Sequence, residues 1–191
     1  MYKEIIEKIL AELSVGLFER EECLKLVLLS MFAGKSIFLY GSLGTAKSMI
    51  ARRASLAFDT LGNSRIPSEN SRIPNENSTE NSKIPTENSR IPNKNKGFFA
   101  YLMNRFSTPE EIFGPIDIAE LKKNNLTRKT DGYLPTAHFA FLDEIWKSSP
   151  AILNTLLTII NERIYRDGNT DVKVPLKCIV CASNEFPPAN Q

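Results

Sequence analysis

Hydrophobic positions along the first sixty residues follow two periods, one typical of helices and one of strands. Apolar residues recur every three or four positions over residues 2–13, which predicts an amphipathic helix that Gly16 ends. Residues 19–32 predict a second helix, and we expect it to be buried because it is apolar on nearly all sides. The apolar run at residues 36–40 predicts a strand, and a third helix is expected over residues 47–58.

Residues 97–191 show the same two periods. Three apolar runs predict strands at residues 98–102, 139–143 and 178–183. Ser149-Pro150 predicts the start of a long helix that Asn161-Glu162-Arg163 ends. We expect its inward side chains to be Ile152, Leu153, Leu156, Leu157, Ile159 and Ile160. Residues 164–174 then predict a β-hairpin around Asp167-Gly168.

A shorter helix is predicted between the first two of these strands. Thr108 is its expected N-cap, Pro109 lies in its first turn, and Glu111 completes a capping box. Gly114-Pro115 ends it. Residues 116–128 are polar with scattered apolar positions, and they fit either a short hairpin or a surface helix.

Residues 63–96 differ in character from the rest of the chain. They repeat a seven-residue unit, as in NSRIPSE and NSKIPTE, with Pro in most copies, so a continuous helix is excluded. The unit has one apolar residue, which is too little burial to offset the entropy of ordering the segment. We predict a disordered surface insertion. A stacked solenoid and a binding segment are the alternatives.

Composition sets limits on the class of protein. The chain has 191 residues, 42% of them hydrophobic, which suits one domain with a hydrophobic core, with or without an appendage. A net charge of +2 does not indicate binding to nucleic acid or to an anionic membrane. The longest apolar run is too short to span a bilayer, and residues 1–10 are amphipathic and carry acids, unlike a signal peptide. We expect a cytoplasmic protein.

The cysteines allow two interpretations. Cys178 and Cys181 form a C-x-x-C, which could be a redox or metal pair. They lie in a predicted strand, however, where residues three apart point to opposite faces. We therefore favour buried structural thiols for this pair.

The stretch IFLYGSLGTAKS, residues 37–48, is the first candidate site. A strand that ends in a loop of small residues and leads into a helix presents backbone N–H groups to a polyphosphate. Lys47 would reach the β- and γ-phosphates, and the Ser48 hydroxyl would bind Mg²⁺. The candidate nucleotide-binding residues are Gly41, Ser42, Leu43, Gly44, Thr45, Ala46, Lys47 and Ser48. The usual pattern has Gly in place of Ala46, and Ala is tolerable if its φ is helical but not if φ is positive. The alternative is a chance glycine-rich turn.

A second candidate site lies at the end of the strand at residues 139–143. Asp143 can hold Mg²⁺ at the strand tip, and Glu144 can polarise an attacking water. The alternative is a solvated strand end. We expect Lys47 and the two acids to lie on adjoining parallel strands and to converge on one triphosphate–metal pocket.

Several stretches together resemble one family, the MoxR branch of the AAA+ ATPases. They are GLFEREECLKLVLL, GSLGTAKSMIARR, YLMNRFSTPEEIFGP, DGYLPTAHFAFLDEIWKSSPAILNTLLTIINER and VCASNEFP. Within that branch they are most similar to the regulatory ATPase variant A (RavA) subfamily. The similarity covers nearly everything except residues 63–96, and the branch often has Ala where Ala46 stands.

The resemblance implies a three-layer αβα P-loop NTPase core with parallel strands in the order 5-1-4-3-2. The loop matches Walker A, and Asp143-Glu144 matches Walker B. Asn184 matches sensor 1, which helps to place the attacking water. Family members continue into a fifth strand, an arginine finger and a lid, so we expect a core truncated after strand four. The expected division is residues 1–62 with the Walker A half, 63–96 as the insertion, and 97–191 with Walker B and sensor 1.

Three functions are compatible with these features. The resemblance implies Mg²⁺-dependent ATP hydrolysis by a chaperone-like remodeller of protein complexes, in a hexameric ring and with a von Willebrand factor A-domain partner. The catalytic candidates are then Glu144, Lys47 and Asn184. A remnant that binds nucleotide without turnover is the first alternative. A nucleic-acid motor is less favoured, because the hairpin at residues 164–174 is mixed in charge.

Overall fold

The computed structural model describes residues 2–42, 44–62, 97–168 and 170–187. The predicted insertion at residues 63–96 and the loop residue Leu43 lie outside these ranges.

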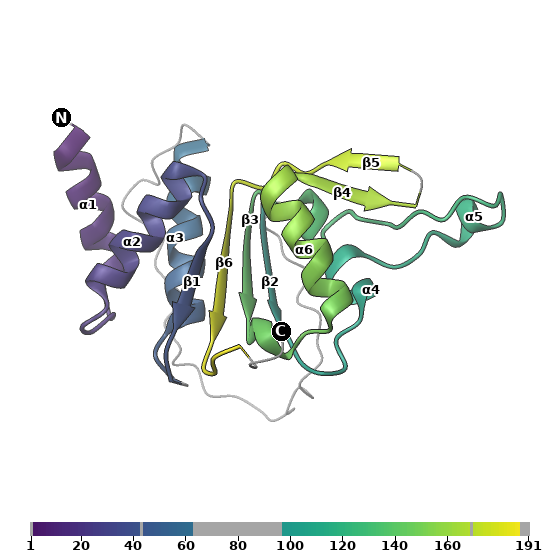
Figure 1. The fold of residues 1–191 in the computed structure, drawn as a ribbon. Helices are drawn as coiled ribbons and strands as arrows, with labels where there is room; N and C mark the ends of the chain where they lie inside the picture. Colours follow the sequence, from purple (N-terminus) through teal and green to yellow (C-terminus); the bar gives the residue numbers. More distant parts are fainter. Residues whose placement is uncertain (1, 43, 63–96, 169, 188–191) are drawn as a thin grey trace, which may run out of the picture.

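A parallel sheet forms the centre of the molecule (Figure 1). Its strands are β1 (Ile37–Tyr40), β6 (Cys178–Ser183), β3 (Phe139–Asp143) and β2 (Phe98–Leu102), side by side in that order. The register places Tyr40 beside Ser183, Phe139 beside Cys178 and Leu102 beside Asp143. Counted along the chain, this is the predicted order 1-4-3-2, with β1 at one edge of the described sheet.

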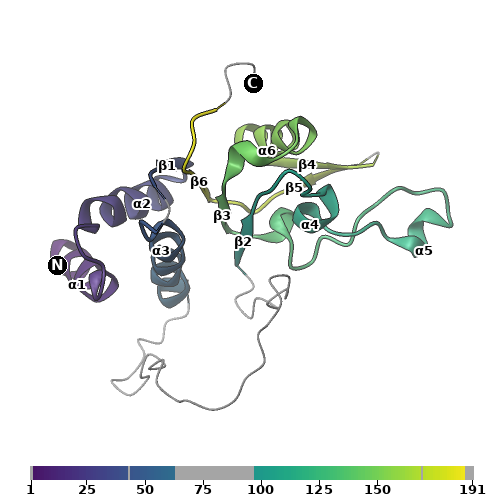
Figure 2. The same cartoon turned by 90° about the horizontal axis from the view of Figure 1, so that it is seen from below.

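Helices cover both faces of the sheet (Figure 2). On one side lie α1 (Tyr2–Ser14), α2 (Glu21–Ala33) and α3 (Lys47–Gly62), and on the other lies α6 (Pro150–Glu162). Alternate residues of β3 enter two separate cores: Phe139 and Phe141 pack with α2 and α3, while Ala140 and Leu142 pack with α6. A strand buried on both faces is typical of parallel α/β sheets, and the predicted αβα fold class is confirmed.

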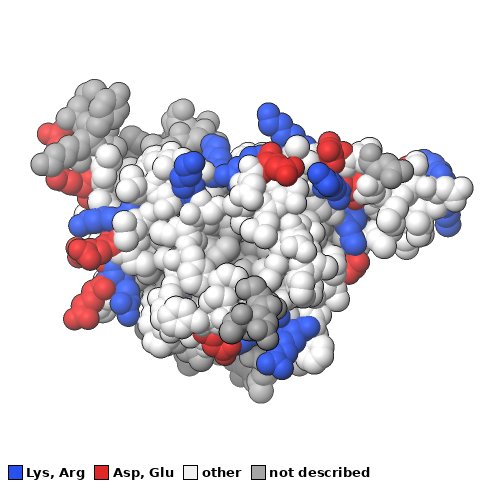
Figure 3. All heavy atoms as spheres, in the orientation of Figure 1, with Lys and Arg blue, Asp and Glu red and all other residues white. Residues whose placement is uncertain are grey.

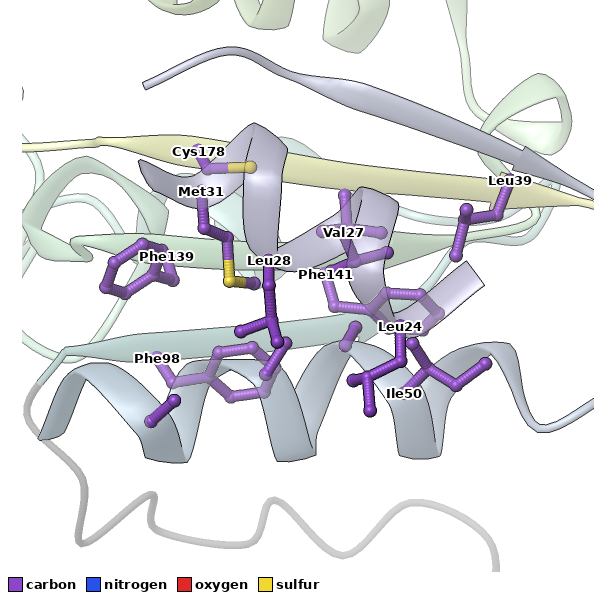
Figure 4. Packing of buried hydrophobic residues seen from close by; sticks show 14 of the residues in the cluster. Leu24, Val27, Leu28, Met31, Leu39, Ile50, Phe98, Phe139, Phe141 and Cys178 are labelled. Carbon is purple, nitrogen blue, oxygen red and sulfur yellow. The ribbon is translucent and has the colours of Figure 1, made fainter. Parts of the chain in front are cut away.

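The core on the α2 side is built mainly from aliphatic side chains (Figure 4). Leu24, Val27, Leu28 and Met31 of α2 are buried there. The expectation that this helix is buried all round is nevertheless wrong, because Leu26, Leu29 and Phe32 are exposed. The helix lies in an outer layer, so only one of its faces meets the sheet and α3. Leu157 of α6 is exposed for the same reason, although the pattern predicted it inward.

The short helix after β2 forms as predicted. It is α4 (Pro109–Phe113), with Thr108 as N-cap, and the Thr108 amide donates to Glu111 Oε2 at 3.0 Å. The segment that follows combines both structures that its sequence allowed. Ile116 and Arg128 form an antiparallel bridge, and the short helix α5 (Ile118–Leu121) lies between them on an arm that projects from the body (Figure 1).

The predicted hairpin is present as β4 (Ile164–Asp167) and β5 (Thr170–Lys173), paired antiparallel. The Asp167 carboxylate accepts the Arg128 amide at 3.1 and 3.0 Å, which joins the hairpin to the α5 arm. Two 3-10 helices, η1 (Leu134–Thr136) and η2 (Ile145–Lys147), flank β3. Within the described ranges, no helix combines the length and the apolar character that a membrane crossing requires.

Charged side chains of both signs lie along the rim of the face in Figure 3. A broad area without Lys, Arg, Asp or Glu lies between them, and the visible surface has no continuous basic stripe.

Candidate functional site

The candidate residues lie at the carboxyl ends of three parallel strands, which form the lower edge of the sheet in Figure 1. Strand β1 leads into Gly41, β3 into Glu144 and β6 into Asn184, and parallel strands end on the same side. The Gly41 amide donates to Ser183 O at 3.2 Å, and this hydrogen bond connects the loop after β1 to the end of β6. One expectation is wrong: β1 and β3 do not adjoin, because β6 lies between them. The strand with Asn184 therefore separates Lys47 from the two acids.

The loop between β1 and α3 uses left-handed backbone conformations. Gly44 has a φ of 78°, which glycine adopts without strain. Ala46 has a φ of 58°, so the helical φ that would make Ala tolerable there is not what the structure shows. Alanine in this region costs about 1–2 kcal/mol, and Ala46 carries that strain directly before Lys47. The Thr45 hydroxyl donates to Ser42 O at 2.9 Å and closes the turn.

Lys47 is the first residue of α3 and is 9% exposed. Its ammonium group donates to two carbonyls of its own loop, to Gly41 O at 2.8 Å and to Ser42 O at 3.0 Å. Ser48 follows in the same helical turn, with its side chain exposed. The positive charge thus lies at the N-terminal end of a long helix, where the free N–H groups of the first turn favour anions.

The acid pair turns the chain from β3 into η2. Asp143 ends the strand, and its Oδ1 accepts the Glu144 amide at 3.0 Å. Glu144 has a φ of 52° and a buried side chain. Its Oε2 lies 3.5 Å from Lys147 Nζ and 3.5 Å from Ser183 Oγ. The left-handed turn therefore directs this carboxylate toward β6 and away from solvent.

Asn184 is the third member of the group. Its side-chain Oδ1 is buried, and among the described residues it has no hydrogen-bond partner. A buried acceptor without a partner costs about 1–3 kcal/mol, so such an atom is typical of a place where a ligand binds. Sequence reasoning missed Lys147 and Ser183, which both contact the Glu144 carboxylate. The sequence signal for Lys147 was its position three residues after Glu144, and the signal for Ser183 was its position directly before Asn184.

The donor set suits a magnesium ion held together with phosphate. Within the described ranges, no group of three or more His, Cys, Asp and Glu could hold a metal without further ligands. Magnesium, however, binds one or two protein oxygens and completes its shell with water and substrate phosphates. Ser48 and Asp143 offer a hydroxyl and a carboxylate of the required kind, so the residues present fit such an ion.

The cysteine pair lies within β6, where Cys178 is buried as expected and Cys181 is only partly buried. Cys178 is buried in the core on the α2 side, and Cys181 packs against the core on the α6 side, so the two thiols point to opposite faces as predicted. Burial raises the pKa of Cys178 to about 11 and the pKa of Cys181 to about 12. Thiols with such pKa values are protonated at neutral pH and are poor nucleophiles.

Comparisons with known proteins agree with this fold. Residues 61–191 match the family described as the MoxR domain in the MoxR-vWA-beta-propeller ternary systems. The uncharacterized protein MJ0812 of Methanocaldococcus jannaschii is 38% identical over 188 residues, which are 98% of this chain and 41% of that protein. Its companion MJ0079 is 38% identical over 187 residues, 97% of this chain and 40% of that protein. The chain thus spans about two fifths of the length of these relatives.

A solved structure described as a "putative ATPase" from Cytophaga hutchinsonii superposes with a TM-score of 0.56. The match covers 100% of this chain and 45% of the other at 17% identity, so it bears on the fold alone. The narrower RavA subfamily is not supported by these matches and stays a prediction. The match over residues 61–191 covers more than half of the chain, and the chain therefore belongs to the MoxR family of AAA+ ATPases.

Proposed function

We propose that this chain binds ATP with Mg²⁺ and hydrolyses it at the edge of the sheet where β1, β3 and β6 end. The observation that carries the proposal is that Lys47, Glu144 and Asn184 follow the ends of three neighbouring strands, β1, β3 and β6, on one side of the sheet. Membership of the MoxR family supports it, and so does the buried Oδ1 of Asn184, which has no hydrogen-bond partner in the part of the chain that the structure describes.

The loop would hold the phosphates. Backbone N–H groups of residues 41–48 and the first turn of α3 supply donors, and the Lys47 ammonium supplies the charge. In the described structure that ammonium already has two carbonyl partners, at 2.8 and 3.0 Å. Binding therefore exchanges bonds to Gly41 and Ser42 for bonds to phosphate oxygens, and the buried charge is never left unpaired. Ser48 and Asp143 would hold the metal ion.

Glu144 would act as the general base and Asn184 would orient the water. A carboxylate beside the γ-phosphate accepts a proton from water as the oxygen attacks phosphorus. The Asn184 Oδ1 accepts one hydrogen bond from that water, which satisfies the atom and fixes the direction of attack. The magnesium ion, when bound, neutralises charge on the phosphate oxygens.

The wider function follows the family expectation. We propose that ATP hydrolysis drives chaperone-like remodelling of protein complexes by a hexameric, cytoplasmic assembly, with a von Willebrand factor A-domain protein as partner. The description of the matched family, as part of MoxR-vWA-beta-propeller systems, supports the choice of partner. The RavA subfamily remains the narrower form of this proposal.

Steady-state phosphate release and nucleotide binding, measured on the same variants, test the proposal. We expect Lys47→Ala to abolish binding, and Glu144→Gln to retain binding while lowering turnover by at least about 100-fold. Lys123→Met is the matched control, because it removes an exposed ion pair with Glu120 far from the site. Binding without turnover in the unaltered chain would point to a nucleotide-binding remnant. Tight, salt-sensitive binding of single-stranded DNA would instead favour a nucleic-acid motor.

A further inference from the structure

We propose that Lys147 is a positioning residue for Glu144. Together with Ser183 it holds one oxygen of the carboxylate and leaves the other to receive the proton of the attacking water. This inference rests on the proposed function, and it concerns a residue that neither the Walker motifs nor sensor 1 includes. It begins from two contacts on the same atom, Glu144 Oε2: Lys147 Nζ at 3.5 Å and Ser183 Oγ at 3.5 Å.

The backbone brings Lys147 to this position. Glu144 adopts a left-handed conformation at the end of β3, and η2 begins directly after it. The Lys147 amide donates to Glu144 O at 2.9 Å, which closes one helical turn between the two residues. In such a turn, side chains three apart lie on the same side. The lysine side chain therefore extends over the carboxylate for a local reason, independent of the rest of the fold.

The two partners differ in burial, and this difference gives the lysine its role. The Glu144 side chain is 7% exposed, whereas the Lys147 side chain is 36% exposed. A buried carboxylate is costly unless a cation or a hydrogen bond accompanies it. Lys147 supplies the positive charge from the solvent side of the pair, so it can hold the carboxylate in place without being buried itself.

Ser183 fixes the carboxylate from the opposite side. The Ser183 hydroxyl is buried and accepts the Glu185 amide at 3.1 Å. A hydroxyl has one proton, and with its oxygen occupied by that amide the proton is directed to Glu144 Oε2. Both contacts are long for hydrogen bonds, so they orient the carboxylate and do not lock it. No hydrogen bond to the second oxygen, Oε1, is found within the described ranges.

The test compares variants by turnover and by nucleotide affinity in the chain as it stands. We expect Lys147→Met to lower kcat about tenfold, since a misplaced general base loses part of its 10²- to 10⁴-fold contribution. The Kd for Mg-ATP should change by less than about twofold, because Lys147 contacts none of the proposed phosphate ligands. Lys147→Arg keeps the charge and should restore most of the rate. Lys123→Met removes an ion pair of the same three-residue spacing, Lys123 with Glu120 at 2.7 Å, and should leave kcat unchanged.

A double variant separates positioning from a merely structural role. If Lys147 acts through Glu144, adding Lys147→Met to Glu144→Gln should lower the residual rate no further. Unchanged or increased turnover in Lys147→Met would overturn the inference, and so would equal losses of rate, affinity and melting temperature. If Glu144→Gln itself turns over like the unaltered chain, or if the unaltered chain shows no turnover, the proposed function fails and takes the inference with it. A large loss in Glu144→Gln with none in Lys147→Met would reject the inference alone.

Discussion

Gly44 offers a sharp test of the loop, because its substitution isolates backbone conformation from packing. Its φ is 78°, and a Cβ added there would meet nothing within 4 Å. Gly44→Ala therefore introduces no clash, and its whole effect is conformational. A left-handed alanine costs about 1–2 kcal/mol. Alanine also lowers the conformational entropy of the unfolded chain, which offsets about 0.4–1 kcal/mol of that cost. The net expected loss is about 1 kcal/mol, which for a chain of this length lowers the melting temperature by about 2–4 °C.

Gly132→Ala is the matched control. Gly132 has a φ of 80°, and its added Cβ would also meet nothing within 4 Å, but it lies in the turn before η1. Both variants should lose the same stability when melted with saturating Mg-ATP. Without nucleotide, the Gly44→Ala loop can relax, so part of its loss should appear as weaker affinity, up to about fivefold. Calorimetric melts with and without nucleotide measure both. If Gly44→Ala melts like the unaltered chain in saturating Mg-ATP, the assigned loop conformation is refuted.

Three further predictions concern stability. Gly114→Ala places a Cβ 2.1 Å from Lys129 O, so urea denaturation should show a loss of more than about 2 kcal/mol, and an unchanged midpoint would contradict the backbone approach there. Thr108→Ala removes the N-cap of α4 and should cost about 1 kcal/mol in the same assay, whereas a neutral effect would argue against the capping box. Cys178 and Cys181 have pKa values raised to about 11 and about 12. The unfolded chain therefore loses these protons first, and the free energy of unfolding should fall as pH rises from the ordinary thiol value toward 11, by about 1.4 kcal/mol per pH unit for each thiol. Alanine at both positions should remove that slope.

Strand bounds were the feature most completely predicted from the sequence. The runs at residues 98–102, 139–143 and 178–183 match β2, β3 and β6 at both ends. Each is a continuous apolar run bounded by polar or turn-forming residues, and a parallel strand buried on both faces requires that composition. The N-cap of α4 was equally clear, because Thr108 and Glu111 satisfy backbone groups within one turn of the chain.

Side-chain surroundings were harder to predict. The pattern of α2 is apolar all round, yet only tertiary packing decides which face meets the sheet, so the exposed side of α2 could not be predicted. The separation of β1 from β3 follows from the strand order, which the family resemblance implied but which neither motif contains by itself. Lys147 and Ser183 reach Glu144 because that residue takes a left-handed turn and β6 adjoins β3. The left-handed turn is not visible in the local sequence, whereas the pairing of β6 with β3 was part of the strand order that the resemblance implied.

We propose that the loop, the acid pair and Asn184 surround one nucleotide–metal site where the strands end. Amide NMR of the labelled chain, titrated with ATP and paramagnetic Mn²⁺ in place of Mg²⁺, tests it most directly. The amide signals of Gly44, Glu144 and Asn184 should broaden first. His138 and Lys177, at the opposite ends of β3 and β6, should stay sharp. Equal broadening at both edges, or none at any amide, would contradict the account.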